Sequence, residues 1–347
     1  MRRDDLRQAK VLEERLEPAD GEALVRVGSF AFTTNNVTYA VVADVLRYWE
    51  FWPAPQGWGR VPAWGFGEVV ASRHPEAKAG DRLYGFWPMS THAVLRVGKV
   101  AGQSLIEGSA HRRGLPIAYN LYRRVASKSP EEEALEALFL PLFGTSFLLD
   151  DFLGESGFFG ARRVIVLSAS GKTALALAHE LRRRGGVEVL GLTSARNEAF
   201  VRGLGLYDRV ATYDAIGSLE KDPSVYVDFA GDSAVRERLH GHLGGALKYA
   251  CAVGMSHGEA RPKGEGLPGP KPVFFFAPEH GRKRAEAWGG DGYARRQEQA
   301  WQAFRPAAAK AITVVRGSGD TAVARVYAEA LEGRVAPDRG HILSLHA

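Results

Sequence analysis

The sequence predicts an α/β protein in which a small β-barrel or sandwich precedes a doubly wound parallel sheet. Three observations support this prediction. The 347 residues exceed the roughly 250–300 at which one hydrophobic core stops growing, so two domains are expected. Short strands separated by turn signals occupy residues 22–97. Strands then alternate with helices over residues 155–300, as in parallel βαβ units.

The N-terminal strands are recognised by alternating apolar and polar residues, many of them β-branched, between turn-forming residues. The residues that follow, 98–129, show no sustained period and are interpreted as loop with short helical pieces. The strands expected on this basis are residues 22–32, 68–72, 81–86 and 92–97.

A long apolar helix is expected next, from Pro130 toward Leu153. Ser129 is a suitable cap, proline is favoured at the first helical position, and three glutamates follow in the first turn, where the helix dipole favours acids. Pro141 and Gly144 predict an interruption of this helix.

The second half of the chain alternates buried-type strands with amphipathic helices. Its Gly- and Pro-rich residues 257–271 predict a long surface loop. The expected strands are residues 163–167, 187–192, 209–213, 224–229, 247–254 and 273–277, and, in the tail, 311–315 and 341–345. The expected helices are residues 174–184, 196–204, 234–243 and 321–331.

The amino-acid composition argues against several classes of protein. Cys251 is the only cysteine, which excludes an intramolecular disulfide and a zinc site built from several thiolates and fits a reducing cytoplasm. The net charge is +5, but the basic clusters are dispersed among acids, so a nucleic-acid partner is not expected. The sequence shows no evident 18-residue apolar run, and its charged start lacks a following apolar stretch, so we expect neither a membrane span nor a secretory signal.

Residues 164–178 carry the strongest functional signal. A buried strand, a turn of small residues and a helix start together form an anion site from backbone N–H groups. Residues 171–173 end like a P-loop, but Val166 occupies the position of its first glycine, which argues against ATP or GTP hydrolysis. The dinucleotide-binding G-x-G-x-x-G pattern is also incomplete here. The residues expected to contact a phosphate are Ser168, Ser170, Gly171, Lys172 and Thr173.

The next strand ends in hydroxyl residues and Arg196, with no acid before Glu198. An NAD site carries Asp or Glu here for the ribose 2′-hydroxyl, whereas an arginine accommodates a 2′-phosphate. We therefore predict NADP(H), with Thr193, Ser194 and Arg196 at the phosphate. Thr193 and Ser194 fit helix capping equally well. The loop that contains Gly231 is expected to border the nicotinamide.

Four stretches carry a resemblance to a known family: residues 86–92 (FWPMSTH), 141–151 (PLFGTSFLLDD), 168–174 (SASGKTA) and 191–194 (GLTS). With them the sequence resembles the medium-chain dehydrogenase/reductase superfamily over nearly its whole length. The resemblance is to the zinc-independent, quinone oxidoreductase-like and enoyl reductase-like branch, in a subgroup known mainly as a domain of unknown function.

The resemblance implies a GroES-like domain over residues 1–150, completed by residues 306–347, and an NADP-binding Rossmann domain over residues 151–305. It also implies a substrate cleft between the two domains and a homodimer formed through edge strands, for which residues 273–277 are the candidate. Tyr213 aligns with a tyrosine that lies near the adenosine phosphate in relatives.

The sequence departs from these relatives at the nucleotide turn, where Lys172 and Ala174 replace two glycines. Lys172 either contacts the cofactor or substrate or is a solvated lysine of the first helical turn. Asn197 takes the place of a lysine that often holds the 2′-phosphate, which leaves Arg196 to do so. Residues 64–68 offer no zinc ligand of the kind used by zinc-dependent branches, so we expect no metal.

A reductase without metal stabilises charge on a substrate carbonyl oxygen by hydrogen bonds and completes the reaction with a proton donor. The segment 33–39 resembles the substrate loop of relatives, which makes Asn36 a candidate to polarise the carbonyl and Tyr39 a candidate donor. In the alternative, Asn36 is a turn residue and Tyr39 a packed aromatic. His92 is a third candidate, although a lone histidine is more often structural.

The function expected from these residues is NADPH-dependent reduction of an activated carbonyl, enone or quinone-type small molecule. The altered glycine turn keeps an alternative open. In that alternative the protein binds NADP(H) but performs a lyase or isomerase step, or has a regulatory role.

Overall fold

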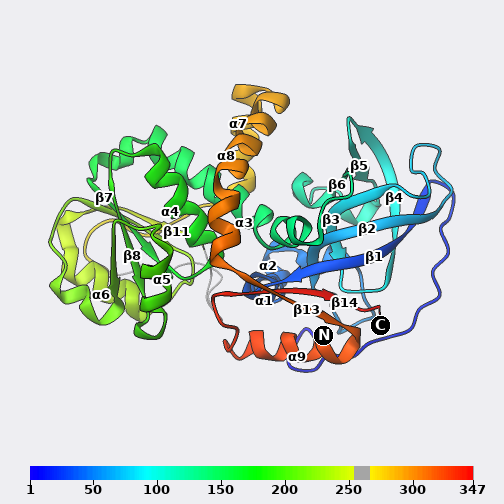
Figure 1. The fold of residues 1–347 in the computed structure, drawn as a ribbon, viewed down its shortest axis with the longest axis horizontal. Coiled ribbons are helices and arrows are strands. Elements are labelled where there is room, and N and C mark those ends of the chain that lie inside the picture. The colour runs from blue at the N-terminus through cyan, green and yellow to red at the C-terminus, as the bar shows by residue number, and fades with distance from the viewer. Residues whose placement is uncertain (254–265, 347) are drawn as a thin grey trace. The chain divides into compact units, whose positions relative to one another are not determined.

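The computed structural model describes residues 1–253 and 266–346 and divides the chain into two compact units. The first contains Met1–Leu138 and Thr313–Ala347, and the second contains Phe139–Ile312. The sequence-based expectation placed the boundaries at residues 150 and 306. Figure 1 shows that both ends of the chain lie in the first unit, with β13 and β14 alongside β1.

The first unit is an eight-stranded sheet with the order β13-β14-β1-β2-β3-β6-β5-β4 (Figure 1). An additional antiparallel pairing of β1 with β4 closes it into the GroES-like barrel. The strands are β1 (Glu22–Phe32), β2 (Pro62–Ser72), β3 (Arg82–Pro88), β4 (His92–Ala101), β5 (Ser104–Glu107), β6 (Leu121–Arg124), β13 (Thr313–Ser318) and β14 (Arg339–Ser344).

Two glycines permit close packing in the barrel. A Cβ atom at Gly65 of β2 would lie 2.2 Å from the carbonyl oxygen of Ser29 on β1. A Cβ atom at Gly85 of β3 would lie 2.3 Å from the ring of Tyr122 on β6. Neither distance is compatible with a side chain, so both positions require glycine.

The interpretation of residues 98–129 needs correction. They contain two strands, β5 and β6, besides the expected short helical pieces η2 (Ala110–Arg112) and η3 (Ile117–Asn120). Each strand has only four residues, which is too short for a period to be recognised, and pairing with neighbouring strands stabilises both. Further helices absent from the prediction follow β1: α1 (Thr34–Val41), α2 (Ala43–Leu46) and η1 (Tyr48–Glu50).

The second unit is a six-stranded parallel sheet with the order β12-β11-β10-β7-β8-β9. The chain runs outward from β7 to β9 on one side and from β10 to β12 on the other, so the strand order reverses between β7 and β10. Ligands of such sheets bind at the carboxyl ends of the strands at this point. The strands are β7 (Arg163–Leu167), β8 (Glu188–Thr193), β9 (Arg209–Thr212), β10 (Ser224–Asp228), β11 (Leu247–Ala252) and β12 (Val273–Phe274).

Helices accompany these strands in the alternation expected for a doubly wound sheet. They include α4 (Lys172–Arg184), α5 (Glu198–Leu204) and α6 (Ser233–Leu243). The core of the unit joins strand residues such as Ile165 and Leu190 to Leu239 of α6, all fully buried.

Helix α3 (Pro130–Glu155) continues through Pro141, so the predicted interruption is wrong. Pro141 lacks the N–H of one helical hydrogen bond. Packing on both sides of it compensates, because Phe139 and Phe143 are fully buried and each contacts the ring of Phe304.

Helix α3 also corrects the statement that no long apolar run exists. Among the described residues it is the one helix long and apolar enough to cross a membrane by length and composition alone. More than half of its apolar stretch is buried within the protein, and core helices of soluble proteins pass the same test.

The region after β11 holds helices that the sequence did not predict. The strand expected at residues 273–277 is only the two-residue β12, followed by α7 (Ala277–Trp288) and α8 (Gly290–Ala311). Helix α8 extends to Ala311, so β13 begins two residues later than expected; α9 (Gly319–Leu331) then follows. Residues 257–265 of the predicted loop lie outside the described residues.

Candidate functional site

The turn after β7 connects a buried strand to the start of helix α4 (Lys172–Arg184). Strand β7 is fully buried, and Ser168 follows it with φ 54°, a left-handed conformation that is uncommon for a residue other than glycine. The Ser168 backbone N–H donates a hydrogen bond to the Tyr213 hydroxyl at 3.1 Å, and the two hydroxyl oxygens are 3.3 Å apart. Tyr213 thus supports the strained first residue of the turn, and burial raises its pKa.

Helix α4 begins directly after this turn, with Gly171 as its extended N-cap residue. Lys172 and Thr173 are its first two residues, and their backbone N–H groups precede the first helical hydrogen bond. Ser170 accepts a hydrogen bond from the Asn197 amide at 3.0 Å, which connects this turn to the end of β8. The first turn of α4 therefore offers the backbone donors that an anion requires.

The end of β8 is free of acidic side chains. Thr193 is buried and Ser194 is half-buried, whereas Arg196 is exposed and makes no ion pair with any residue in the described part of the chain. The first acid, Glu198, pairs with Arg202 at 2.7 Å. Arg196 thus supplies an uncompensated positive charge at the position where an NAD site carries an acid.

The loop after β10 is held by a buried carboxylate. Asp228 accepts hydrogen bonds from the backbone N–H groups of Ala230 at 3.0 Å and Gly231 at 2.9 Å. Arg236 of α6 lies 3.6 Å from the other carboxylate oxygen and donates to the Gly231 carbonyl at 3.2 Å. Burial raises the pKa of Asp228 despite these donors. Gly231, with φ 74°, lies in this loop beside the switch point of the sheet.

In the first unit, both polar atoms of the Asn36 side chain already form hydrogen bonds with the backbone. Its Oδ1 accepts from the Thr33 backbone N–H at 2.8 Å and completes a capping box at the start of α1. Its Nδ2 donates to the Pro62 carbonyl at 2.9 Å, and the side chain is 4% exposed. These contacts support the structural alternative for Asn36 over a role in polarising a carbonyl.

Tyr39 lies in an aromatic cluster of the first unit. The Trp64 indole N–H donates a hydrogen bond of 3.3 Å to its hydroxyl, and the side chains of Asn35 and Tyr119 lie near enough to influence its pKa. Burial raises the pKa of Tyr39 well above its usual value, with a further contribution from Tyr119. Tyr39 is therefore protonated at neutral pH, as a proton donor must be.

His92 stands apart from this cluster. Its Nδ1 lies 3.2 Å from the Thr91 hydroxyl, and its ring contacts that of His346 at 5.6 Å. Burial, followed by the charges of His346 and Arg26, lowers its pKa. Within the described residues no hydrogen bond or ring contact joins His92 to Tyr39, so the structure does not bring the two together.

The sequence reasoning missed Asn35 and Tyr119 as neighbours of the Tyr39 hydroxyl. Asn35 is four residues before Tyr39, on the same face of α1, and is half-buried. This spacing would have indicated the contact if residues 34–41 had been recognised as a helix. Tyr119 comes from η3, far away in sequence, and no local signal reports its position.

One group of side chains in the described residues has the spacing of metal ligands. Ligand atoms of Asp151, Glu155 and His280 all lie within 4.8 Å of one another. Arg284 already occupies this group, because its guanidinium pairs with Asp151 at 2.5 Å and with Glu155. The cluster joins α7 to α3 as a salt-bridge network, with the arginine providing the positive charge.

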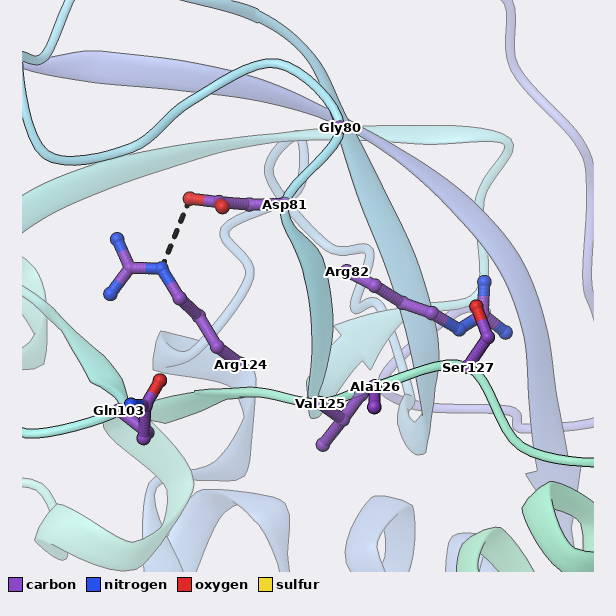
Figure 2. A pocket seen from close by; sticks show the side chains of 8 residues that line it. All are labelled: Gly80, Asp81, Arg82, Gln103, Arg124, Val125, Ala126 and Ser127. Atoms are coloured by element: carbon purple, nitrogen blue, oxygen red, sulfur yellow. Dashed lines mark hydrogen bonds and ion pairs between the residues drawn. The ribbon is translucent and has the colours of Figure 1, made fainter.

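An open depression of about 410 Å³ lies in the first unit, and none of the candidate residues lines it (Figure 2). Two arginines contribute to its wall, and both are already paired. Arg124 donates to Asp81 at 3.1 Å, and Arg82 binds Glu133 through two hydrogen bonds of 3.0 and 2.6 Å. No charge is left there to recognise an anion.

The comparison with protein families identifies the chain. A family model described as "Protein of unknown function (DUF2855)" matches residues 30–336. The chain belongs to the DUF2855 family. This confirms the expected subgroup known mainly as a domain of unknown function. No curated protein matches this DUF2855 sequence.

Solved structures share the fold of this DUF2855 protein. CurA from Vibrio vulnificus in complex with NADPH has a TM-score of 0.60 at 12% identity, covering 97% of this chain and 94% of that one. The CurK enoyl reductase has a TM-score of 0.57 at 14% identity, covering 96% and 93%. A thermostable alcohol dehydrogenase from Pyrobaculum aerophilum has a TM-score of 0.55 at 15% identity, covering 95% and 93%. The DUF2855 chain therefore has the two-domain fold of medium-chain dehydrogenases/reductases.

Proposed function

We propose that this protein is an NADPH-dependent, zinc-independent oxidoreductase that reduces an activated carbonyl, enone or quinone-type small molecule. The observation that carries the proposal is the uncompensated Arg196 at the end of β8, beside the N-terminal turn of α4. A 2′-phosphate requires a positive charge at this place, and a pyrophosphate requires the backbone donors of a helix start. The NADPH complex of CurA, which has the same fold, supports the choice of cofactor.

The residues of the second unit fit such a cofactor. Ser170, Gly171, Lys172 and Thr173 would hold the pyrophosphate, and Ser194 and Arg196 would hold the 2′-phosphate. A Cβ atom at Gly191 in β8 would lie 2.9 Å from Tyr207 and 3.0 Å from Ala169, so glycine keeps the strand close to the turn. Gly231 and its loop would border the nicotinamide, which supplies a hydride when bound.

The first unit contributes the proton. Tyr39 is protonated at neutral pH, its hydroxyl accepts a hydrogen bond from Trp64, and Asn35 lies nearby. We propose that Tyr39 donates its proton to the substrate and that the Asn35 amide, rather than the locked Asn36, polarises the substrate oxygen. Tyr39 is buried, and the ring of Phe86 packs edge-on against it at 5.3 Å.

Cofactor binding and turnover of the full-length protein test this proposal. Saturation at about a hundredfold over the dissociation constant stabilises a protein by about 2.7 kcal/mol, which is measurable as a rise in melting temperature. We expect this rise with NADPH and a smaller one with NADH. We also expect loss of NADPH absorbance with at least one member of a panel of quinones and enones.

Two outcomes would contradict the proposal in different ways. Equal stabilisation by NADPH and NADH would contradict the proposal that Arg196 binds the 2′-phosphate. Tight NADPH binding without turnover of any panel member would favour the non-reductive alternative, in which the bound cofactor serves a lyase or isomerase step or a regulatory role.

A further inference from the structure

One buried ion pair fixes the loop between β10 and α6. Asp228 ends β10, and its Oδ1 accepts hydrogen bonds from the backbone N–H groups of Ala230 at 3.0 Å and Gly231 at 2.9 Å. Arg236 Nε lies 3.6 Å from Oδ2 of the same carboxylate, and the guanidinium donates to the Gly231 carbonyl at 3.2 Å. The two side chains together therefore bind both backbone polar groups of Gly231.

Both members of the pair are removed from solvent, since Asp228 is 1% and Arg236 is 2% exposed. Removing one member of a buried ion pair is strongly destabilising, because it leaves the other charge without compensation. Burial raises the pKa of Asp228, and the positive charge of Arg236 opposes this rise. Arg236 therefore stabilises the charged carboxylate that binds the loop.

The loop lies at the edge of the sheet where a dinucleotide binds in this type of fold. Strands β10 and β7 are parallel neighbours, with Val227 opposite Val166, so the loop after β10 and the turn after β7 leave the sheet at the same edge. Ala230 is exposed, whereas Gly231 is buried. The outer side of the loop is thus accessible to a ligand, while its inner side is held by the ion pair.

We propose that Asp228 and Arg236 are positioning residues for the nicotinamide half of the cofactor. This inference rests on the proposed function. Both side chains are buried, so they act through the backbone of residues 229–231, which they hold in the shape of one wall of the nicotinamide site before the cofactor binds. The 2′-phosphate and the pyrophosphate depend instead on Arg196 and on the first turn of α4.

A ligand without a nicotinamide separates this role from a general effect on stability. The nucleotide 2′,5′-ADP carries the adenosine and the 2′-phosphate of NADPH but no nicotinamide. We expect Arg236→Gln in the full-length protein to weaken NADPH binding by about tenfold and 2′,5′-ADP binding by less than about twofold. Arg236→Lys, which keeps the positive charge, should recover part of the NADPH affinity. Isothermal titration calorimetry measures both dissociation constants.

Arg163 provides a matched control at the opposite edge of the same sheet. It is the first residue of β7, is 2% exposed, and pairs with Glu188 at 2.6 Å and with Asp222 at 3.0 Å. Arg163→Gln therefore also breaks a buried ion pair of the second unit, but at the amino end of a strand. We expect it to lower stability while the ratio of the two dissociation constants remains that of the wild type.

Equal weakening of both ligands by Arg236→Gln, or no weakening of either, would overturn the positioning role. Hydrogen exchange of the wild type without cofactor needs no variant to fold. The Gly231 amide should exchange at least about tenfold more slowly than in an unstructured peptide, and exchange at the unstructured rate would overturn the preformed wall.

The proposed function fails in a different way. A wild type that binds neither NADPH nor 2′,5′-ADP would overturn the proposed cofactor, and the positioning role with it. Tight NADPH binding without turnover of any substrate would contradict the reductase activity, whereas the ratio of dissociation constants would still decide whether Arg236 positions the nicotinamide.

Discussion

The Tyr213 hydroxyl accepts a hydrogen bond from the Ser168 backbone nitrogen, 3.1 Å away, and so supports a left-handed residue in the turn after β7. A left-handed conformation favours glycine, whereas this chain has a serine there and supports it through a side chain from the segment after β9. The turn therefore depends on Tyr213 as well as on its own residues.

Tyr213→Phe should lower the free energy of unfolding by about 1 kcal/mol, because the Ser168 N–H loses its partner. Urea unfolding of the full-length protein measures this loss. Tyr84→Phe is the matched control, since the hydroxyl it removes has no hydrogen-bond partner in the described structure. Equal losses in the two variants would contradict a role for the Tyr213 hydroxyl in supporting the turn.

Adjacent asparagines should respond differently to substitution. Asn36→Ala removes the capping box and the contact with the Pro62 carbonyl, so we expect a loss of about 2 kcal/mol of stability. Asn35→Ala should change stability by less than about 0.5 kcal/mol, because this side chain is half-buried and outside the capping box. Chemical denaturation compares the two variants, and a larger loss for Asn35→Ala would reverse the roles assigned to them.

Arg196→Glu should weaken NADPH binding by at least about tenfold, equivalent to about 1.4 kcal/mol, and leave NADH binding nearly unchanged. The physical reason is that only NADPH carries the 2′-phosphate. Fluorescence titration with each cofactor measures both affinities. Lys221→Glu, a reversal of an exposed charge elsewhere in the same unit, controls for the change in net charge. A parallel loss for both cofactors would show that Arg196 does not select between them.

His240 should make stability depend on pH. It is fully buried, its Nδ1 contacts the Pro268 carbonyl at 2.9 Å, and its Nε2 contacts the Tyr226 hydroxyl at 3.0 Å. Burial, and then the charge of Arg236, lowers its pKa from the usual 6.5, although the Pro268 contact opposes this. The unfolded chain thus binds a proton below about pH 6.5 that the folded protein binds only at lower pH.

Stability should therefore fall as the pH decreases from about 7 to 5. His240→Gln removes the titrating group and is expected to reduce this dependence, although it is less stable than the wild type at neutral pH. Urea unfolding at several pH values measures both slopes. Identical slopes for variant and wild type would assign the pH dependence to other groups.

We propose that two copies of the chain pair through β12, which is an edge strand of the parallel sheet in the described structure. Val273 and Phe274 are 47% and 37% exposed there, which is unusual for large apolar residues at a sheet edge. Phe274→Glu should convert a dimer to a monomer in sedimentation experiments. Ile117→Glu, at an apolar residue of the first unit that is more exposed than either, should not. A monomeric wild type would contradict the proposal.

The regular part of the fold could be predicted from the sequence because its signals are local. The buried strand at residues 163–167 and the alternation that follows correspond closely to β7 through β11. Strands β5 and β6 escaped prediction because each has only four residues, too few for a period to be recognised. Pro141 was misleading because tertiary packing around α3 outweighs its local preference to break a helix.

In the candidate site, too, the features set by neighbouring residues were predictable, whereas those set by distant residues were not. The residues of the nucleotide turn lie in one continuous stretch, so their proximity followed from the chain itself. Asparagine at position 36 is able to polarise a carbonyl, but its amide is bound to the Pro62 carbonyl at the start of β2, a contact that the local sequence does not indicate. The contact between the Tyr48 and Tyr119 hydroxyls depends on the position of η3, which residues 98–129 do not indicate by any local pattern.

Strand β1 pairs with β14, with Phe30 opposite Leu343. This pair therefore forms only after the last strand of the sequence has been synthesised. All residues of the parallel-sheet unit, by contrast, are contained in one continuous segment, Phe139–Ile312. During synthesis the ribosome therefore completes this later unit first, while the earlier barrel remains an open sheet with an unpaired edge. The order in which the two units mature is the reverse of the order in which they begin.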